Sequence, residues 1–207
     1  HVVKLKKFLE RANFESFLYL SSTRVYYSST STREDSTLIV DPLKFDNLYN
    51  ICKIMGEAIC NASQKQNVRI VRLSNVTGKN FNTNVFLPSI IFDAIENKEI
   101  ILKTKLESEK DYVLLEDVLE ILPKICMSGK DKMYNVGYGQ NLKNIDIVEK
   151  IKQITGCTYN VAKDAKEHSF PTISIQKIQN EFNFQPTSIL AKLNDIITAI
   201  QKKHNLD

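Results

Sequence analysis

The sequence has few of the residues that bind metals or build disulfide frameworks. Its four cysteines are widely spaced and form no CxxC pair, and its three histidines are isolated from one another. A disulfide-stabilised domain needs a denser set of cysteines, and a zinc site needs paired ligands. The sequence therefore predicts no metal site and four reduced thiols, as expected of a cytoplasmic protein.

Long apolar stretches and clusters of like charge are absent too. No apolar run approaches the ~18 residues of a transmembrane span, and the first residues do not read as a signal peptide. The net charge of +4 is small, and no basic stripe carries interleaved aromatic residues. We therefore expect neither a membrane nor a nucleic acid as a partner.

What the sequence does contain is a regular alternation of apolar patterns. With 207 residues and a hydrophobic share of 43%, the chain is long enough for a sizeable core. Helical spacing and short apolar runs alternate, which predicts an α/β fold with a parallel sheet. Helices are expected near 2–12, 48–66, 85–97, 116–126, 144–155, 174–183 and 188–203, and strands at 17–20, 68–73, 99–103, 133–137 and 158–161. The helix at 144–155 is expected to end at a Gly156 cap.

Two polar loops leave the expected strands at the ends where ligands bind. The serine loop SSTRVYY follows the strand at 17–20, and the asparagine loop SNVTGKN follows the strand at 68–73. In open parallel sheets, ligands occupy the crevice outside the carboxyl ends of the strands. The helix at 48–66 lies between these strands in sequence, so we expect the two loops and this helix to meet at one crevice.

That helix carries Tyr49 and Lys53, four residues apart and therefore on one face. A nearby ammonium group favours the ionised form of a phenol, and such a tyrosine can act as general acid or base. The spacing alone also fits a solvent-exposed helix face, and Tyr159 and Lys163 repeat it elsewhere. The choice between the two pairs needs the surrounding segments.

The order of those segments resembles a known family. SSTRVY, LYNICKIMGE, VRIVRLSNVTG, EKDYVLLEDV and MYNVG follow one another along the chain. This order resembles the extended short-chain dehydrogenase/reductase superfamily, in its NAD-dependent epimerase/dehydratase branch, which acts on nucleotide sugars. The resemblance covers essentially the whole chain. It implies a Rossmann-like parallel sheet, NAD or NADP as cofactor, and a nucleotide sugar as substrate.

The resemblance also assigns roles to individual residues. It implies that Tyr49 is the general acid or base, that Lys53 holds the nicotinamide ribose, and that the Ser22 hydroxyl assists. By the same resemblance, the cofactor site comprises Ser21, Tyr49, Lys53, Ser74 and Val76, and the substrate site comprises Thr23, Asn75, Asn84 and Lys110.

Several assignments keep a structural alternative. Lys110 stands where the family often has an arginine facing the pyrophosphate, but it also fits a surface lysine beside Asp111. Asp111 and Asp117 are expected to be structural, fixing a loop and capping the next helix. Lys166 is a second candidate phosphate cation, but its alignment is too weak to assign.

Thr23 and Arg24 depart from the family pattern in an informative way. The family's 4,6-dehydratases usually carry an acidic pair at these positions, which supplies acid and base for the elimination of water. Without those carboxylates, the resemblance implies epimerisation or ketoreduction. Arg24 itself fits either a contact to a carboxylate or phosphate of the substrate or a solvated loop cation.

The glycine-rich fingerprint of the family is not in the sequence. None of the six glycines forms a GxGxxG motif, which places backbone amides against the NAD pyrophosphate. We therefore expect the chain to represent the C-terminal two-thirds of such an enzyme, without the N-terminal cofactor half and inactive alone. A truncation, a split gene product and a short protein with a new role all fit. The last would be a non-catalytic module that binds a nucleotide sugar or a protein partner.

Two domains follow from this interpretation. Residues 1–80 would be the C-terminal part of a Rossmann-like domain with the catalytic serine, tyrosine and lysine, and residues 81–207 a smaller mixed α/β lobe for the nucleotide sugar. The two share strands and loops, so their boundary is soft. The helices at 48–66 and 85–97 are candidates for a homodimer interface, although their apolar faces equally fit core positions.

Overall fold

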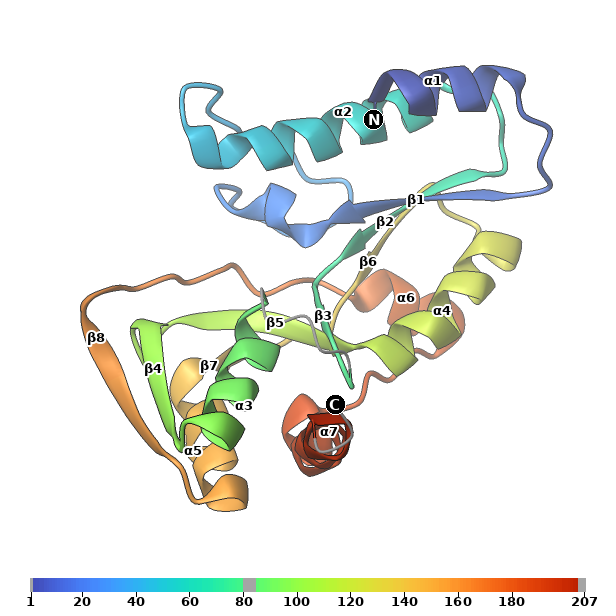
Figure 1. Ribbon diagram of the computed structural model, residues 1–207. Helices are drawn as coiled ribbons and strands as arrows, with labels where there is room; N and C mark the ends of the chain where they lie inside the picture. Colours follow the sequence, from blue (N-terminus) through green and yellow to red (C-terminus); the bar gives the residue numbers. More distant parts are fainter. Residues whose placement is uncertain (1, 80–84, 205–207) are drawn as a thin grey trace.

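The structure, a computed structural model, describes residues 2–79 and 85–204 and confirms the α/β class (Figure 1). The helices are α1 (Val2–Arg11), α2 (Leu48–Ala62), α3 (Phe86–Glu96), α4 (Leu115–Ser128), α5 (Asn144–Thr155), α6 (Gln176–Phe182) and α7 (Ile189–His204), with short 3-10 turns η1 (Thr23–Tyr26) and η2 (Phe45–Asn47). The strands are β1 (Phe17–Ser22), β2 (Val68–Leu73), β3 (Asn75–Thr77), β4 (Glu99–Thr104), β5 (Glu109–Leu114), β6 (Met133–Val136), β7 (Asn141–Lys143) and β8 (Thr158–Lys166).

A three-stranded parallel sheet forms the first layer. Its order is β1-β2-β6, with Tyr19 opposite Ile70 and Val71 opposite Tyr134. Helices α1 and α2 lie on one face of this sheet, and α4 and α6 lie on the other (Figure 1). Both faces of β2 are therefore covered, which explains why four of its six residues, Val68, Ile70, Val71 and Arg72, are buried.

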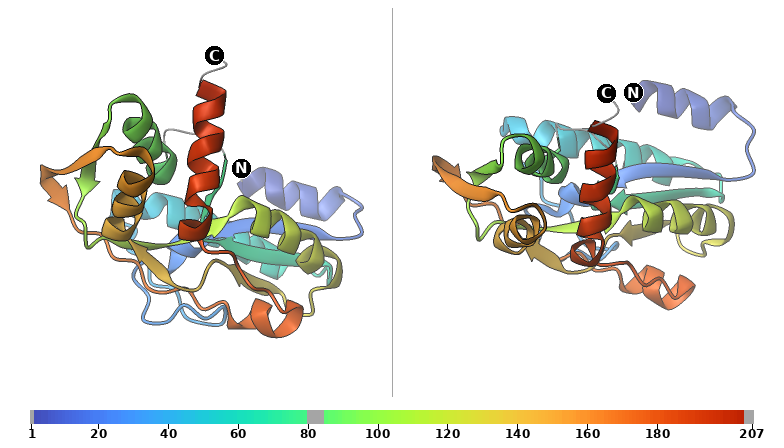
Figure 2. Two further views of the ribbon diagram at one scale, coloured as in Figure 1. Left: turned by 90° about the horizontal axis from the view of Figure 1, so that it is seen from below. Right: turned by 60° about the horizontal axis from the view of Figure 1, so that its bottom comes forward.

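The remaining strands form a second, mixed region. Strand β5 pairs parallel with β3 and antiparallel with β7, while β4 pairs parallel with β8. Helices α3, α5 and α7 pack beside these strands around a core that includes Leu102, Ile147 and Leu193 (Figure 2). Strand β6 comes from beyond residue 80 and still completes the first sheet, so the two regions are joined by backbone hydrogen bonds. The division at residue 80 stays a prediction.

Most predicted elements are present, and the differences have physical causes. The helix expected at 48–66 ends at Ala62, and the strand expected at 158–161 extends to Lys166. Three strands, β3, β5 and β7, lie where loops were expected. The strands β3 and β7 and the first half of β5 contain mostly polar residues, and each strand is held in place by a partner strand that is remote in sequence. A local sequence pattern does not indicate which remote strand will pair with a segment.

Two predicted caps had different outcomes. Gly156 ends α5 in the left-handed conformation, with φ of 72°, as predicted. The expectation that Asp117 caps a helix is wrong: its carboxylate accepts hydrogen bonds from the backbone N–H of Thr187 at 2.7 Å and from the Thr187 hydroxyl at 3.1 Å. Asp117 therefore ties α4 to the segment before α7. Within the described ranges, no helix is both long and apolar enough to cross a membrane.

Candidate functional site

A cavity of about 340 Å³ lies at the carboxyl ends of β1 and β2. The serine loop, the first turn of α2 and the asparagine loop all contribute to its walls, as the strand order predicted. Its lining consists of Ser22, Thr23, Arg24, Tyr49, Ser74, Asn75, Val76, Val85, Lys110, Asp111, Phe170, Pro171 and Ile173.

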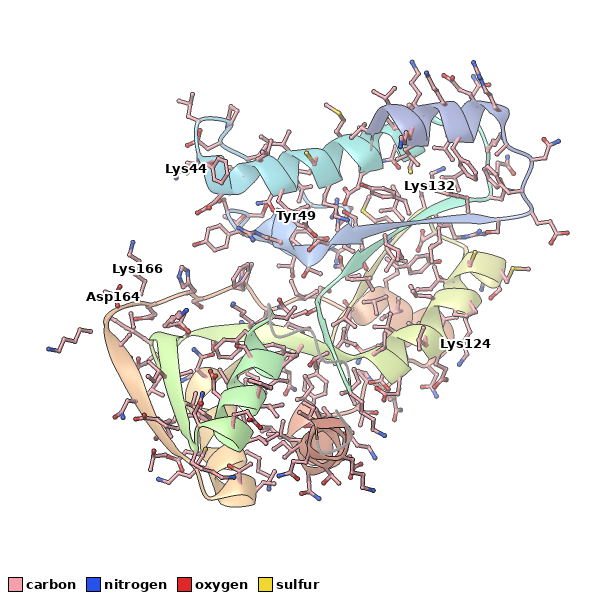
Figure 3. All side chains as sticks on the ribbon, in the orientation of Figure 1. Lys44, Tyr49, Lys124, Lys132, Asp164 and Lys166 are labelled. Atoms are coloured by element: carbon pink, nitrogen blue, oxygen red, sulfur yellow. The ribbon has the colours of Figure 1, made fainter. Side chains whose placement is uncertain are left out.

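Tyr49 stands at the start of α2 with its side chain accessible. The residue is 47% exposed, and Figure 3 shows it on the side of α2 that faces the strands. The ammonium nitrogen of Lys53 lies 5.6 Å from the centre of its ring, and the guanidinium carbon of Arg24 lies 5.8 Å away. Lys53 also donates a hydrogen bond to the carbonyl of Leu20 at 2.9 Å. Two cations therefore flank this phenol.

The serine loop turns sharply away from β1 into η1. The Ser22 hydroxyl accepts a hydrogen bond from the backbone N–H of Arg24 at 3.2 Å and so caps this turn. Thr23 is buried at 7% exposure, although it lines the cavity. The cap fixes the backbone that carries Ser22, Thr23 and Arg24 toward the cavity.

The neighbouring Ser21 has a different environment. It is buried and donates a hydrogen bond to Glu57 of α2 at 2.5 Å. Arg72 of β2 binds the same carboxylate through two nitrogens, at 2.9 and 2.7 Å, and donates to the hydroxyl of Tyr26. Tyr26 in turn donates to Asn135 of β6 at 3.0 Å. Ser21 thus belongs to a buried network and does not line the cavity; its predicted cofactor role stays a prediction.

The asparagine loop is held by Asp111 of β5. Ser74 donates to the Asp111 carbonyl at 2.8 Å and to its carboxylate, and Asn75 donates to the carbonyl at 2.7 Å. The backbone N–H groups of Tyr138 and Gly139 donate to the carboxylate at 2.9 and 2.6 Å. Burial raises the pKa of Asp111 above its usual range, while these donors oppose the shift. The structural role predicted for Asp111 is confirmed.

Lys110 enters the cavity from β5, next to that carboxylate, but forms no ion pair with it. Its ammonium nitrogen lies 5.7 Å from the centre of the Phe86 ring and 5.8 Å from that of Phe170. Burial lowers the pKa of Lys110, and the positive charge of Arg24 lowers it further. Lys110 and Arg24 therefore contribute two positive charges to the lining of the same cavity.

Sequence reasoning missed one wall of the cavity. The segment after β8 places Phe170, Pro171 and Ile173 over it, held by hydrogen bonds between this segment and Glu109. A second cavity of about 680 Å³ shares Arg24, Lys110 and Phe170 with the first. The sequence of this segment contains no motif that would have indicated its position.

Other predicted residues lie elsewhere. Tyr159 is in β8, and its hydroxyl donates to Glu149, so the second Tyr-x-x-x-Lys pair is not at the cavity. Asn84 lies outside the described residues.

Among the residues with described positions, no three histidine, cysteine, aspartate or glutamate side chains form a group that could hold a metal ion.

The fold and the cavity define an α/β protein with an exposed tyrosine and a lysine at the carboxyl edge of a parallel sheet. The model of the NAD dependent epimerase/dehydratase family matches residues 1–137. The chain belongs to this family, which confirms the resemblance drawn from its motifs. A comparison with curated proteins found no match.

Solved structures share the fold. A dTDP-glucose 4,6-dehydratase from Bacillus anthracis, in complex with NAD, has a TM-score of 0.85 and 20% identity, and the match covers 99% of this chain and 67% of that one. A UDP-glucuronic acid 4-epimerase from Bacillus cereus, with UDP-glucuronic acid and NAD, has a TM-score of 0.78 and 20% identity, covering 97% and 67%. A protein called RMD from Pseudomonas aeruginosa, with NADPH, has a TM-score of 0.80 and 18% identity, covering 98% and 71%.

Proposed function

We propose that this chain supplies the catalytic site of an NAD(P)-dependent enzyme that epimerises or reduces a nucleotide sugar. One observation carries the proposal: Ser22, Tyr49 and Asn75, from three separate segments, line a single cavity. The ammonium nitrogen of Lys53 lies 5.6 Å from the centre of the Tyr49 ring. These residues come from the motifs by which the chain resembles its family, and the family match supports the general activity.

Each side chain has its own role in the proposed reaction. Tyr49 removes the proton from a sugar hydroxyl, and the Ser22 hydroxyl hydrogen-bonds the same oxygen. The Lys53 ammonium stabilises the phenolate form of Tyr49, which accepts this proton. NAD(P), when bound, supplies the acceptor and donor of hydride. In epimerisation Tyr49 returns its proton after the keto sugar has turned over; in ketoreduction Tyr49 donates the proton to the carbonyl oxygen.

The residues around Tyr49 fit the nicotinamide end of such a cofactor. Lys53 uses one of its three N–H donors on the Leu20 carbonyl, which leaves two for a ribose. Ser74 and Val76 border the cavity beside Tyr49. We propose that these residues hold the nicotinamide riboside, and that Asn75 and Lys110 hold the nucleotide sugar.

The carboxylates near the cavity argue against dehydration. Thr23 and Arg24 occupy the positions where the resemblance would place an acid and a base. Asp111 lines the cavity, but its carboxylate oxygens accept from Ser74 and from backbone N–H groups. None of the described cavity residues therefore offers a free carboxylate to eliminate water.

Substitution of Tyr49 by phenylalanine tests the assignment. Measured on the enzyme that includes the N-terminal cofactor half, turnover of a panel of nucleotide sugars with NAD and NADP should fall by about 10²- to 10⁴-fold in Tyr49→Phe, because the proton acceptor is lost. Tyr159→Phe is a matched control, since it changes the tyrosine of the second pair and should retain activity. Circular dichroism should show both variants folded. Unimpaired turnover in Tyr49→Phe would contradict the proposal.

A second candidate is a non-catalytic module that binds a nucleotide sugar or a protein partner. The absence of a GxGxxG motif among the six glycines favours it, because that motif supplies the phosphate site of the cofactor. Separate calorimetric titrations with a nucleotide sugar and with NAD or NADP test both candidates. Binding of a nucleotide sugar without binding of NAD or NADP supports the module, or an enzyme that has lost its cofactor half, whereas binding of both supports a competent catalytic site.

A homodimer through α2 and α3 also remains a proposal. Helix α2 leaves Leu48 and Met55 more than half exposed, at 57% and 51%. Helix α3 buries Leu87, Ile90 and Ile91 in the core of its own chain. The structure thus favours α2 as the larger contributor, and sedimentation of Met55→Glu against the natural chain would test it.

A further inference from the structure

Arg24 has an unusual position for a loop cation. It lines both the first cavity and the larger one beside it. Its guanidinium stands over the ring of Tyr49, at 5.8 Å from the ring centre. Over the described ranges, its side chain forms no ion pair with a carboxylate.

A second unpaired cation shares the same space. Lys110 also lines both cavities and, in the part of the chain described, has no carboxylate within ion-pair distance. Burial lowers the pKa of Lys110, and the positive charge of Arg24 lowers it further, as expected for two cations that line the same cavities. An anionic ligand bound between them would be attracted to both positive charges.

The acidic residues nearby do not offset these charges. Asp111 lines the first cavity, but it is buried and accepts hydrogen bonds from Ser74 and from backbone groups. The second cavity adds Asp46, together with Lys44 and His168. The cavities therefore have an excess of positive charge.

We propose that Arg24 binds a carboxylate on the sugar, so that the substrate is a nucleotide-linked uronic acid. This inference rests on the proposed function and adds the class of substrate. Tyr49 is the group that reacts with the sugar, and Arg24 lies over Tyr49, so Arg24 faces the sugar end of the ligand. Lys110 stands over Phe86 and Phe170 instead, which leaves it for the pyrophosphate.

The chemistry of the two cations fits this division. The planar guanidinium of an arginine presents paired N–H donors that match the two oxygens of a carboxylate. A lysine ammonium acts as a compact point charge and suits a phosphate. Thr23, whose hydroxyl belongs to the same turn, is buried and uncharged, so it adds no competing anion.

Isothermal titration of the natural chain, without cofactor, tests the inference. The ligands are the uridine, thymidine, guanosine and cytidine diphosphates, followed by the matched glucose and glucuronic acid derivatives of the base that binds best. We expect the uronic acid to bind at least about tenfold more tightly than the neutral sugar, from one charge-assisted pair. Arg24→Gln should abolish this preference and leave the affinity for the neutral sugar within about twofold.

Three further variants separate the explanations. Arg24→Lys should restore part of the preference, and Lys110→Gln should weaken the diphosphate and both sugar derivatives alike. Arg33→Gln is the control, because Arg33 is an exposed arginine paired with Asp35, outside both cavities. It should change neither affinity nor preference.

Each contrary result has a distinct meaning. Equal affinity for the neutral and acidic sugars would overturn this inference and leave the proposed function standing. A preference that survives Arg24→Gln would overturn the role of Arg24. If Arg24→Gln weakens the binding of the nucleoside diphosphate that carries no sugar, Arg24 binds a phosphate and not the sugar carboxylate. A folded chain that binds none of these ligands would overturn the proposed function, and this inference with it.

Discussion

The buried pair between Glu57 and Arg72 offers the sharpest test of how the site is held together. Its side chains are 4% and 3% exposed, and two nitrogens of Arg72 contact the carboxylate at 2.9 and 2.7 Å. Ser21 donates to the same carboxylate. Glu57 therefore joins α2, which carries Tyr49, to β2 and to the end of β1, which leads into the serine loop.

Glu57→Gln keeps the shape of the side chain and removes its charge. Arg72 then stays buried with one carboxylate oxygen replaced by an amide N–H₂ group, and two donors face each other. Loss of one partner from a buried pair costs about 3–5 kcal/mol in the free energy of unfolding. We expect a loss of at least ~3 kcal/mol, measured by urea unfolding followed by circular dichroism at pH 7.

A double variant and a surface control make the test decisive. Glu57→Gln combined with Arg72→Met should cost less than the sum of the two single changes, because the unpaired charge is then removed as well. Glu10→Gln removes an exposed pair with Lys6, whose nitrogen and oxygen lie 3.9 Å apart, and should cost under ~0.5 kcal/mol. A cost below ~1 kcal/mol for Glu57→Gln, or full additivity in the double variant, would refute the reasoning.

Two further predictions concern packing and reactivity in α2. Gly56→Ala should destabilise the fold by about 1–3 kcal/mol in urea unfolding, because a Cβ there would lie 2.1 Å from the Tyr19 hydroxyl oxygen; an unchanged midpoint would contradict this contact. Cys60 is fully buried, and burial raises its pKa to about 11, so less of it is thiolate at any given pH. Iodoacetamide at pH 8 should therefore modify the half-buried Cys52 before Cys60, which peptide mass spectrometry would show; equal rates would count against the buried position.

Much of the fold could be predicted because its longer elements carry strong periodic patterns. The strand VRIVRL and the helix around Tyr49 lie where apolar spacing indicated. Strand β5 was missed because its first residues, Glu109–Asp111, are charged. Its place in a sheet depends on β3 and β7, and on donors that satisfy the buried Asp111.

The candidate site was predicted only where its residues follow the strands of the first sheet. Side chains alternate across a strand, and β1 shows this: Tyr19 and Ser21 are buried, whereas Leu20 is 43% exposed. The same alternation could have predicted that Ser21 faces α2 and not the cavity. Phe170 reaches the cavity from a segment after β8, through hydrogen bonds to Glu109 that no local pattern encodes.

The two buried carboxylates explain why the cavity is left positive. Glu57 fixes the wall formed by α2, β1 and β2, and Asp111 fixes the wall formed by β5 and the asparagine loop. Both acids face inward and accept from structural donors, so neither neutralises the cations that project from these walls. Arg24 belongs to the first wall and Lys110 to the second. Because the walls are held independently of those cations, the positive charge between them can be used for an anionic ligand without loss of the fold.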